Sequence, residues 1–531
     1  MYKNFYQSSV WARYIAILLI LPFVFASCDS DDDVDDGSGT NDLTGNLEIY
    51  NLDERNDSGV SGTVTFAEAT NGSTVITIDL TGTSDGNSHP AHIHMNTAAE
   101  GGDIVVSLTD VDGDDGESVT VVAQTDAGNS LSYNDLITYD GYVNVHLSSS
   151  DLMVVAQGDI GENALTGVSE SYQLDERNSS GVSGVVTFYA RQDGTTLAEI
   201  DVDGTPVDGD HPAHIHANTA AEGGPIVISF NNVDGGTGMS YTNIEAFDDG
   251  TSVTYNELIQ YNGYVNVHLS SSDLTVVSQT DIGGNAFTGN STVYNLDERN
   301  SSGVSGTATF YERNNGNTQV VLDVQGTPAD GDHPAHIHAN SAAEGGAIVM
   351  SLTNVDGSTG MSTTEISETD DGNAISYSEL INYDGYINVH LSSGDLTVVA
   401  QGDVGSNALT GESIVYDFTA LNSSGVTGTA TLSERKDGTA LLELNMTGTP
   451  ADGDHPAHIH ANSAAEGGPI VISLTNVEGS TGLSRTSIDS FNDGAPVTYA
   501  DLLSYDGYIN VHLSASDLTV VSQTDIGSND N

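Results

Sequence analysis

Cysteine and basic residues are scarce in this 531-residue sequence, and each shortage excludes something. The single cysteine, Cys28, cannot form a disulfide bond within the chain. Ten lysines and arginines stand against 76 aspartates and glutamates, which gives a formal net charge of −66 at pH 7. Nucleic acids are polyanions, so a chain with this charge repels them. We therefore expect no nucleic-acid partner.

The N-terminal segment has the pattern of an export signal. A basic head precedes an apolar run at residues 14–25, and two small residues then lead to Cys28. This order is typical of a secretory signal peptide, which we place at residues 1–27. The run is too short to be a comfortable membrane span. Cysteine directly after the small pair resembles the lipobox of bacterial lipoproteins, which implies a lipid anchor on Cys28. The alternative is an ordinary signal peptide with an incidental cysteine.

Residues 28–46 are predicted to be a disordered acidic tether. Aspartates dominate residues 29–36, and glycine, serine and threonine follow them. Like charges mixed with glycine and serine cannot bury enough apolar surface to fold. An acidic run after a lipidated cysteine also resembles the signal that directs some lipoproteins to the cell surface. That resemblance implies an outer-membrane lipoprotein of a Gram-negative bacterium, held to the membrane by its lipid and exposed at the surface.

The rest of the chain is one unit repeated four times. Landmark residues recur every 122 residues without insertions, as in the series Tyr50, Tyr172, Tyr294 and Tyr416. This period is too long for a solenoid repeat and is the size of an independent domain. We therefore predict four domains, at residues 47–168, 169–290, 291–412 and 413–531.

Short alternating apolar segments predict an antiparallel β-sandwich or barrel in each unit. In unit 1, strands are expected up to Phe66 and at residues 74–80, joined by a turn at Asn71-Gly72. Further strands are expected at residues 91–94, 104–108, 142–147 and 152–157. Ser132 and Asp135 predict a capped helix at residues 133–139, with Gly141 as its left-handed C-terminal cap.

All sixteen histidines belong to one recurring pattern. Each unit carries His-Pro-Ala-His-Ile-His, followed later by Asn-Val-His-Leu. Because strand side chains alternate between faces, His92 and His94 share a face and can converge with His146. Three imidazoles with an open position suit copper or zinc, one ion per repeat. The predicted ligands are His92, His94, His146, His214, His216, His268, His336, His338, His390, His458, His460 and His512. A fourth ligand, or a group that orients the ligands, is predicted at His89, His211, His333 and His455.

A second interpretation of the same histidines needs no metal. Tyr142, Asn144 and His146 share a strand face, so the three histidines could form a hydrogen-bonded polar cluster with these two neighbours. The histidine pattern alone does not choose between a metal centre and such a cluster.

The unit resembles a known family, the CHRD domain. The resemblance rests on Ala-His-Ile-His, the following Gly-rich loop, Ile-Val-Val-Ser-Leu, and Gly-Tyr-Val-Asn-Val-His-Leu in unit 1. CHRD domains are similar to Cu,Zn superoxide dismutase, which implies a Greek-key β-sandwich and matches His92, His94 and His146 to copper ligands. This chain has no histidines left over for the zinc site of that enzyme, and it cannot form the enzyme's disulfide. A net charge of −66 also repels an anionic substrate.

These observations predict a non-enzymatic, lipid-anchored extracytoplasmic protein with a binding or display role. No nucleophile–base pair or phosphate-binding loop is visible in the sequence. Its partner would be an unidentified protein or surface ligand. Two alternatives stay open, namely a copper-dependent redox protein and an adhesin that binds through its repeats.

Overall fold

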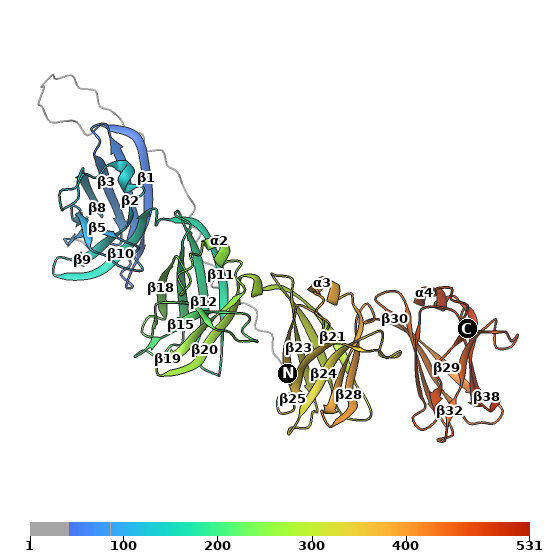
Figure 1. The fold of residues 1–531 in the computed structure, drawn as a ribbon. Helices are drawn as coiled ribbons and strands as arrows, with labels where there is room; N and C mark the ends of the chain where they lie inside the picture. The colour runs from blue at the N-terminus through green and yellow to red at the C-terminus, as the bar shows by residue number, and fades with distance from the viewer. Residues whose placement is uncertain (1–41, 85, 531) are drawn as a thin grey trace, which may run out of the picture.

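The computed structural model describes residues 42–84 and 86–530. Four all-β units follow one another in a row along the chain (Figure 1). Each unit has a hydrophobic core of its own, and no core residue is shared between units. The prediction of tandem all-β domains with one short helix each is confirmed. The predicted signal peptide, Cys28 and most of the tether lie outside the described residues.

Unit 1 is a curled sheet that folds over its core in two halves. The strand order is β6-β5-β9-β10-β1-β2-β3-β8, and a short β4–β7 pair bridges the open side. The connections from β3 to β4 and from β8 to β9 cross from one half to the other, as in a Greek key. The elements are β1 (Leu43–Glu54), β2 (Ser61–Ala69), β3 (Thr74–Thr81), β4 (Ser88–His89), β5 (Ala91–Met95), β6 (Ile104–Ser107), β7 (Val111–Asp112), β8 (Glu117–Val122), α1 (Tyr133–Leu136), β9 (Asp140–Ser148) and β10 (Asp151–Gly161).

Units 2 and 4 repeat this order. Unit 2 comprises β11 (Leu165–Glu176), β12 (Ser183–Arg191), β13 (Thr196–Asp203), β14 (Asp210–His211), β15 (Ala213–Ala217), β16 (Ile226–Ser229), β17 (Val233–Asp234), β18 (Met239–Ile244), α2 (Tyr255–Leu258), β19 (Gly263–Ser270), β20 (Asp273–Ile282) and the 3-10 helix η1 (Gly283–Asn285). Unit 4 comprises β29 (Leu409–Ala420), β30 (Thr427–Arg435), β31 (Ala440–Thr447), β32 (Asp454–His455), β33 (Ala457–Ala461), β34 (Ile470–Ser473), β35 (Val477–Glu478), β36 (Leu483–Ile488), α4 (Tyr499–Leu503), β37 (Asp506–Ser514) and β38 (Asp517–Gly527).

Unit 3 closes the same sheet into a barrel. Its strands β24 and β25 run without a break, and the pair Asp356–Met361 joins β25 to β26. The cyclic order is β21-β22-β23-β26-β25-β24-β27-β28. Its elements are β21 (Phe287–Glu298), β22 (Ser305–Arg313), β23 (Thr318–Gln325), β24 (Asp332–Ala339), β25 (Ile348–Asp356), β26 (Met361–Ile366), α3 (Tyr377–Leu380), β27 (Asp384–Ser392) and β28 (Asp395–Gly405).

The first strand of each unit begins before the predicted domain boundary. In unit 1, β1 starts at Leu43, so residues 43–46 of the predicted tether belong to a strand. The same offset recurs at Leu165, Phe287 and Leu409. The side chains at the start of β1 are exposed, so the alternation that identifies a half-buried strand is missing there.

The helix prediction is correct in its start and wrong in its end. Ser132 and Asp135 form both hydrogen bonds of the capping box, but α1 ends at Leu136 rather than near residue 139. Gly141 is not a left-handed cap, because it lies within β9. A Cβ atom there would lie 2.5 Å from the Tyr139 ring and 2.6 Å from the His94 carbonyl oxygen. Close packing, rather than a positive φ, therefore explains this glycine.

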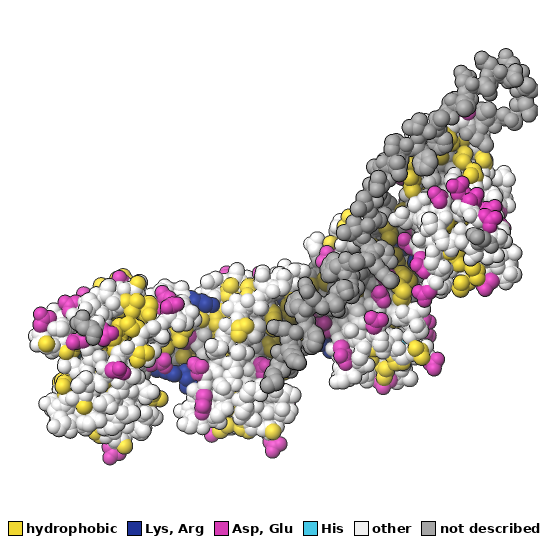
Figure 2. Space-filling view, turned by 180° about the vertical axis from the view of Figure 1, so that it is seen from behind, with side chains coloured by type: hydrophobic (Ala, Val, Ile, Leu, Met, Phe, Trp, Pro, Cys, Tyr) yellow, Lys and Arg dark blue, Asp and Glu magenta, His cyan; other side chains and the backbone are white. Residues whose placement is uncertain are grey.

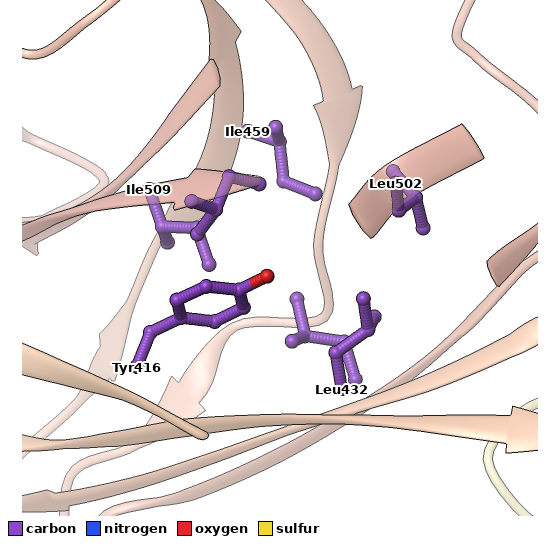
Figure 3. Close-up of a pocket in the computed structure, with 7 residues that line it drawn as sticks. Tyr416, Leu432, Ile459, Leu502 and Ile509 are labelled. Carbon is purple, nitrogen blue, oxygen red and sulfur yellow. The ribbon is translucent and has the colours of Figure 1, made fainter. Parts of the chain in front are cut away.

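A small void in the core of unit 4 has no room for a ligand. A cavity of about 10 Å³ in unit 4 is lined by apolar side chains, with the Tyr416 hydroxyl group pointing toward it (Figure 3). That volume is at the lower limit for one water molecule, and an apolar lining offers water few hydrogen bonds. This void is therefore not a ligand site. No helix within the described residues is long and apolar enough to cross a membrane.

Candidate metal centre

The histidine-bearing strands β5 and β9 lie side by side in antiparallel register. His92 lies opposite Asn144, and His94 lies opposite Tyr142. The intervening residue Ile93 points into the core and is fully buried. The histidines therefore occupy the outer face of the β6-β5-β9-β10 half, as strand alternation predicts.

The structure brings the three predicted ligands of every unit together. One ring nitrogen from each of His92, His94 and His146 lies within 4.8 Å of the others. The rings of His92 and His146 have their centroids 5.4 Å apart, and the same distance in the other units is 5.4, 5.4 and 5.3 Å. The equivalent clusters are His214, His216 and His268; His336, His338 and His390; and His458, His460 and His512.

Backbone carbonyl groups fix which nitrogen faces the cluster in two of its three rings. Nδ1 of His94 lies 2.9 Å from the Gly102 carbonyl oxygen, and Nδ1 of His146 lies 2.8 Å from that of Leu152. A carbonyl oxygen only accepts, so both Nδ1 atoms carry the hydrogen and both Nε2 atoms keep a free lone pair in the neutral ring. The same pair of contacts recurs in units 2, 3 and 4.

Two nitrogens in each cluster are buried and have no hydrogen-bond partner among the described residues. In unit 1 they are Nδ1 of His92 and Nε2 of His94. A buried nitrogen without a partner is costly, so one such pair calls for an explanation and four equivalent pairs do so more strongly. The other pairs are His214 Nδ1 and His216 Nε2, His336 Nδ1 and His338 Nε2, and His458 Nδ1 and His460 Nε2.

Burial and neighbouring histidines favour the neutral imidazole of the first histidine in each cluster. Burial lowers the pKa of His92, and the nearby His146 and His94 lower it further. The equivalent His214, His336 and His458 have lowered pKa values for the same reasons, with burial first. Neutral imidazole is the form that binds a metal ion.

The neighbouring polar residues are engaged elsewhere, which weakens the interpretation as a metal-free cluster. The Tyr142 ring stacks on His94 with centroids 4.8 Å apart, while its hydroxyl group accepts the Gly102 N–H. Asn144 accepts a hydrogen bond from Gln157 through Oδ1. Within the described residues, neither side chain satisfies the unpaired nitrogens of His92 and His94.

The structure does not bring His89 into the cluster. His89 is buried, and its Nδ1 lies 3.1 Å from the carbonyl oxygen of His146. The His146 N–H in turn donates to the Pro90 carbonyl group. In units 2 to 4, Nε2 of the equivalent histidine also lies 3.1–3.3 Å from a proline carbonyl oxygen. This histidine therefore holds the backbone that carries the third ligand, and sequence alone left that role undecided.

The surroundings of the cluster in unit 1 include exposed aliphatic side chains. His92 and His146 are half-buried. Ile104, which pairs with His94 across the sheet, is exposed, and so is Leu152, whose carbonyl group holds His146. Acidic side chains are scattered over the molecular surface in Figure 2. The cluster thus has an open side within a strongly acidic protein.

Together the fold and the clusters define a tandem Greek-key protein with one three-histidine cluster per unit. A comparison with family models matches the CHRD domain to residues 406–517. This segment covers most of unit 4 and includes His458, His460 and His512. No curated protein matches the chain.

Proposed function

We propose that each unit binds one copper or zinc ion through its three histidines, and that the chain is a non-enzymatic extracytoplasmic binding or display protein. The observation that carries the proposal is the set of buried, unpaired imidazole nitrogens that recurs at the same place in all four units. Imidazole nitrogen suits both metals, and three ligands leave a position open for water or a partner group. Carbonyl groups that fix the Nδ1 hydrogens are the usual outer support of metal-binding histidines.

The decisive experiment is calorimetric titration of the metal-free mature chain with Cu(II) and with Zn(II). We expect about four equivalents of metal, one for each cluster. Replacing His92 and His146 by Gln should remove one equivalent and leave the other three. Met95→Ala serves as the matched control, because Met95 is exposed on the same strand outside the cluster. An unchanged stoichiometry in the His92→Gln/His146→Gln variant would show that these residues are not ligands.

A copper-dependent redox protein is the second candidate. The open side of the cluster and the partly exposed His92 favour it, because a redox substrate must reach the metal. The net charge of −66 makes superoxide an unfavourable substrate, because the protein repels anions. Copper-loaded chain should then oxidise a neutral or cationic reductant, and activity should fall in step with each cluster removed. A binding protein would keep its partner after the metal is stripped.

Adhesion through repeats is the third candidate, and it predicts that avidity falls as units are deleted.

The proposed location is the outer membrane of a Gram-negative bacterium, with a lipid on Cys28. It is supported by the signal-like segment and the acidic run after Cys28. The mass of the N-terminal peptide from membrane-extracted protein tests the anchor, since a lipidated cysteine is heavier and must be the first residue.

A further inference from the structure

Three arginines are buried at the junctions between units. Arg191, Arg313 and Arg435 occupy equivalent positions near the ends of β12, β22 and β30, and they are among the largest fully buried side chains. Each guanidinium reaches a carboxylate of the preceding unit, at 2.6 Å for Asp159 and Arg191. The other two pairs are Arg313 with Asp281 at 2.9 Å and Arg435 with Asp403 at 3.2 Å. A buried charge requires such a partner.

The acceptor aspartate also holds the loop that follows the histidine-bearing strand. In unit 1, Oδ2 of Asp159 accepts from Arg191, while Oδ1 accepts the Ala98 N–H at 2.7 Å. The same backbone contact is 2.7 Å long in the other three units. Arg191 also donates to the Asn163 carbonyl oxygen, and the Asn163 side chain donates to the Asn96 carbonyl oxygen of the same loop.

This loop carries the carbonyl group that orients a predicted ligand. Gly102, at the end of the loop, accepts the Nδ1 hydrogen of His94. The loop is braced internally, because Asn96 donates to the Gly101 carbonyl oxygen and Thr97 donates to Glu100. A shift at Ala98 therefore moves Gly102 with it. A continuous series of contacts thus leads from Arg191 in unit 2 to His94 in unit 1.

We propose that each junction arginine is a positioning residue for the metal centre of the unit before it. The inference rests on the proposed metal-binding function. It makes the first three centres dependent on the unit that follows. The fourth centre is built differently, because Asp525 accepts the Ala464 N–H but forms no ion pair within the described residues. Unit 1 has Ala69 where the later units have the arginine.

The test uses the full mature chain with one centre left intact. Replacing His268, His390 and His512 by Gln leaves only the centre of unit 1, and Arg191→Met is then added. We expect the Kd for Cu(II) to rise about tenfold, as is typical when an outer group orienting a metal-binding histidine is lost. The electron paramagnetic resonance spectrum of bound Cu(II) should also change. In metal-free protein, the amides of Ala98 and Gly102 should exchange hydrogen faster.

The matched control is Arg435→Met in the same background. It opens an equivalent junction far from unit 1, so the affinity of centre 1 should stay unchanged. A second background keeps only the fourth centre, and there Arg435→Met should have no effect although the arginine lies in that very unit. The proposal therefore predicts that each arginine affects only the centre of the unit before it. A general loss of stability would affect the centres on both sides of the junction.

Two outcomes would overturn the proposal. One is an unchanged Kd and spectrum at centre 1 after Arg191→Met, and the other is an equal effect of Arg435→Met on that centre. If Arg191→Met impairs folding, Arg191→Met/Asp159→Asn removes both charges and keeps an oxygen for the Ala98 N–H, so a smaller rise in Kd is expected. If the parent variant binds no metal, the proposed function fails instead. The exchange of Ala98 and Gly102 in metal-free protein then still decides whether the arginine positions the loop.

Discussion

All three junctions bury an equivalent arginine, but its hydrogen-bond partners differ. The middle junction, between units 2 and 3, pairs the arginine more completely than the two outer junctions do. Arg313 lies between two carboxylates, since Asp281 binds Nη1 while Glu365 binds Nε at 2.7 Å and Nη2 at 2.6 Å. At the first junction Asn243 replaces this glutamate, and in the part of the chain that the structure describes Nε and Nη2 of Arg191 have no hydrogen-bond partner. At the third, Ser487 accepts one hydrogen bond from Arg435 and leaves Nε unpaired.

The first junction has a second contact at its rim, and the third has like charges there instead. Arg55 of unit 1 lies over the Tyr241 ring of unit 2, with its Cζ atom 4.9 Å from the ring centroid. Arg299 occupies the equivalent place at the third junction, where burial and then the charge of Arg485 lower its pKa. The corresponding position in unit 3 is Thr363, which offers no ring. Basic side chains gather between units 3 and 4 in Figure 2, at the left of the view.

This alternation follows a longer period in the sequence. Units 1 and 3 share Val-Val-Ala-Gln-Gly-Asp before the junction, whereas units 2 and 4 share Val-Val-Ser-Gln-Thr-Asp. The chain is thus a pair of units repeated twice. The first junction combines a partly paired arginine with a cation–π contact, and the third has a partly paired arginine with Arg299 and Arg485 close by. The junction between the pairs relies on a fully paired arginine. We therefore expect the middle junction, where the buried arginine is fully paired, to be the stiffest of the three.

Removing the central arginine should have the largest effect. Arg313→Met leaves Asp281 and Glu365 buried without a counter-charge, which costs about 3–5 kcal/mol by analogy with other broken buried pairs. Arg191→Met leaves one carboxylate and should cost less. Amide hydrogen exchange of junction reporters measures both, because the Asp193 and Asn315 N–H groups donate to the preceding unit. Equal losses of opening free energy at the two junctions would contradict the expected difference between Arg313 and Arg191. Arg177→Met is the control, because Arg177 is exposed.

Exchanging the residues at the position of the second carboxylate, Glu365 and Asn243, should make the stability of each junction more like that of the other. Glu365→Asn removes two charged hydrogen bonds from Arg313, and the opening free energy reported by Asn315 should fall by about 1.5–3 kcal/mol. Asn243→Glu supplies the missing carboxylate to Arg191 and should slow exchange at Asp193. The gain should be smaller than the loss, because Gln319 also donates to Glu365 while Leu197 occupies that position in unit 2. No change at Asp193 would show that Arg191 is satisfied in another way, such as by water.

The histidine clusters could be predicted because strand periodicity fixes which side chains share a face. His92 and His94 are two residues apart on one strand, and any antiparallel neighbour that carries His146 on the same face completes the cluster. The role of His89 could not be predicted, because β4 is only two residues long and gives no alternation to read. The direction of its ring depends on the position of the His146 carbonyl group, which is set by tertiary packing.

The junction arginines escaped prediction for a different reason. Arg191 stands just before Gln192-Asp193-Gly194, where an exposed residue beside a turn is the ordinary expectation. Only the approach of the preceding unit buries it. A signal did exist in the sequence, because Arg191, Arg313 and Arg435 recur with the domain period and unit 1 has Ala69 in their place. A charge that appears only where a preceding domain exists indicates a contact between domains.

The smallest expected effect concerns the rim. Arg55→Ala removes the cation–π contact with Tyr241, and the opening free energy of the first junction should fall by about 0.5–1 kcal/mol. Arg177→Ala is the matched control, because Arg177 donates to Gln279 as Arg55 does to Gln157, while the position equivalent to Tyr241 is Thr363, which has no ring. Tyr241→Thr copies the residue of the middle junction and completes a double-mutant cycle. A coupling energy near zero between Arg55 and Tyr241 would mean that this rim contact contributes nothing, so the first junction would then depend on its partly paired arginine alone and should open more readily than the middle one.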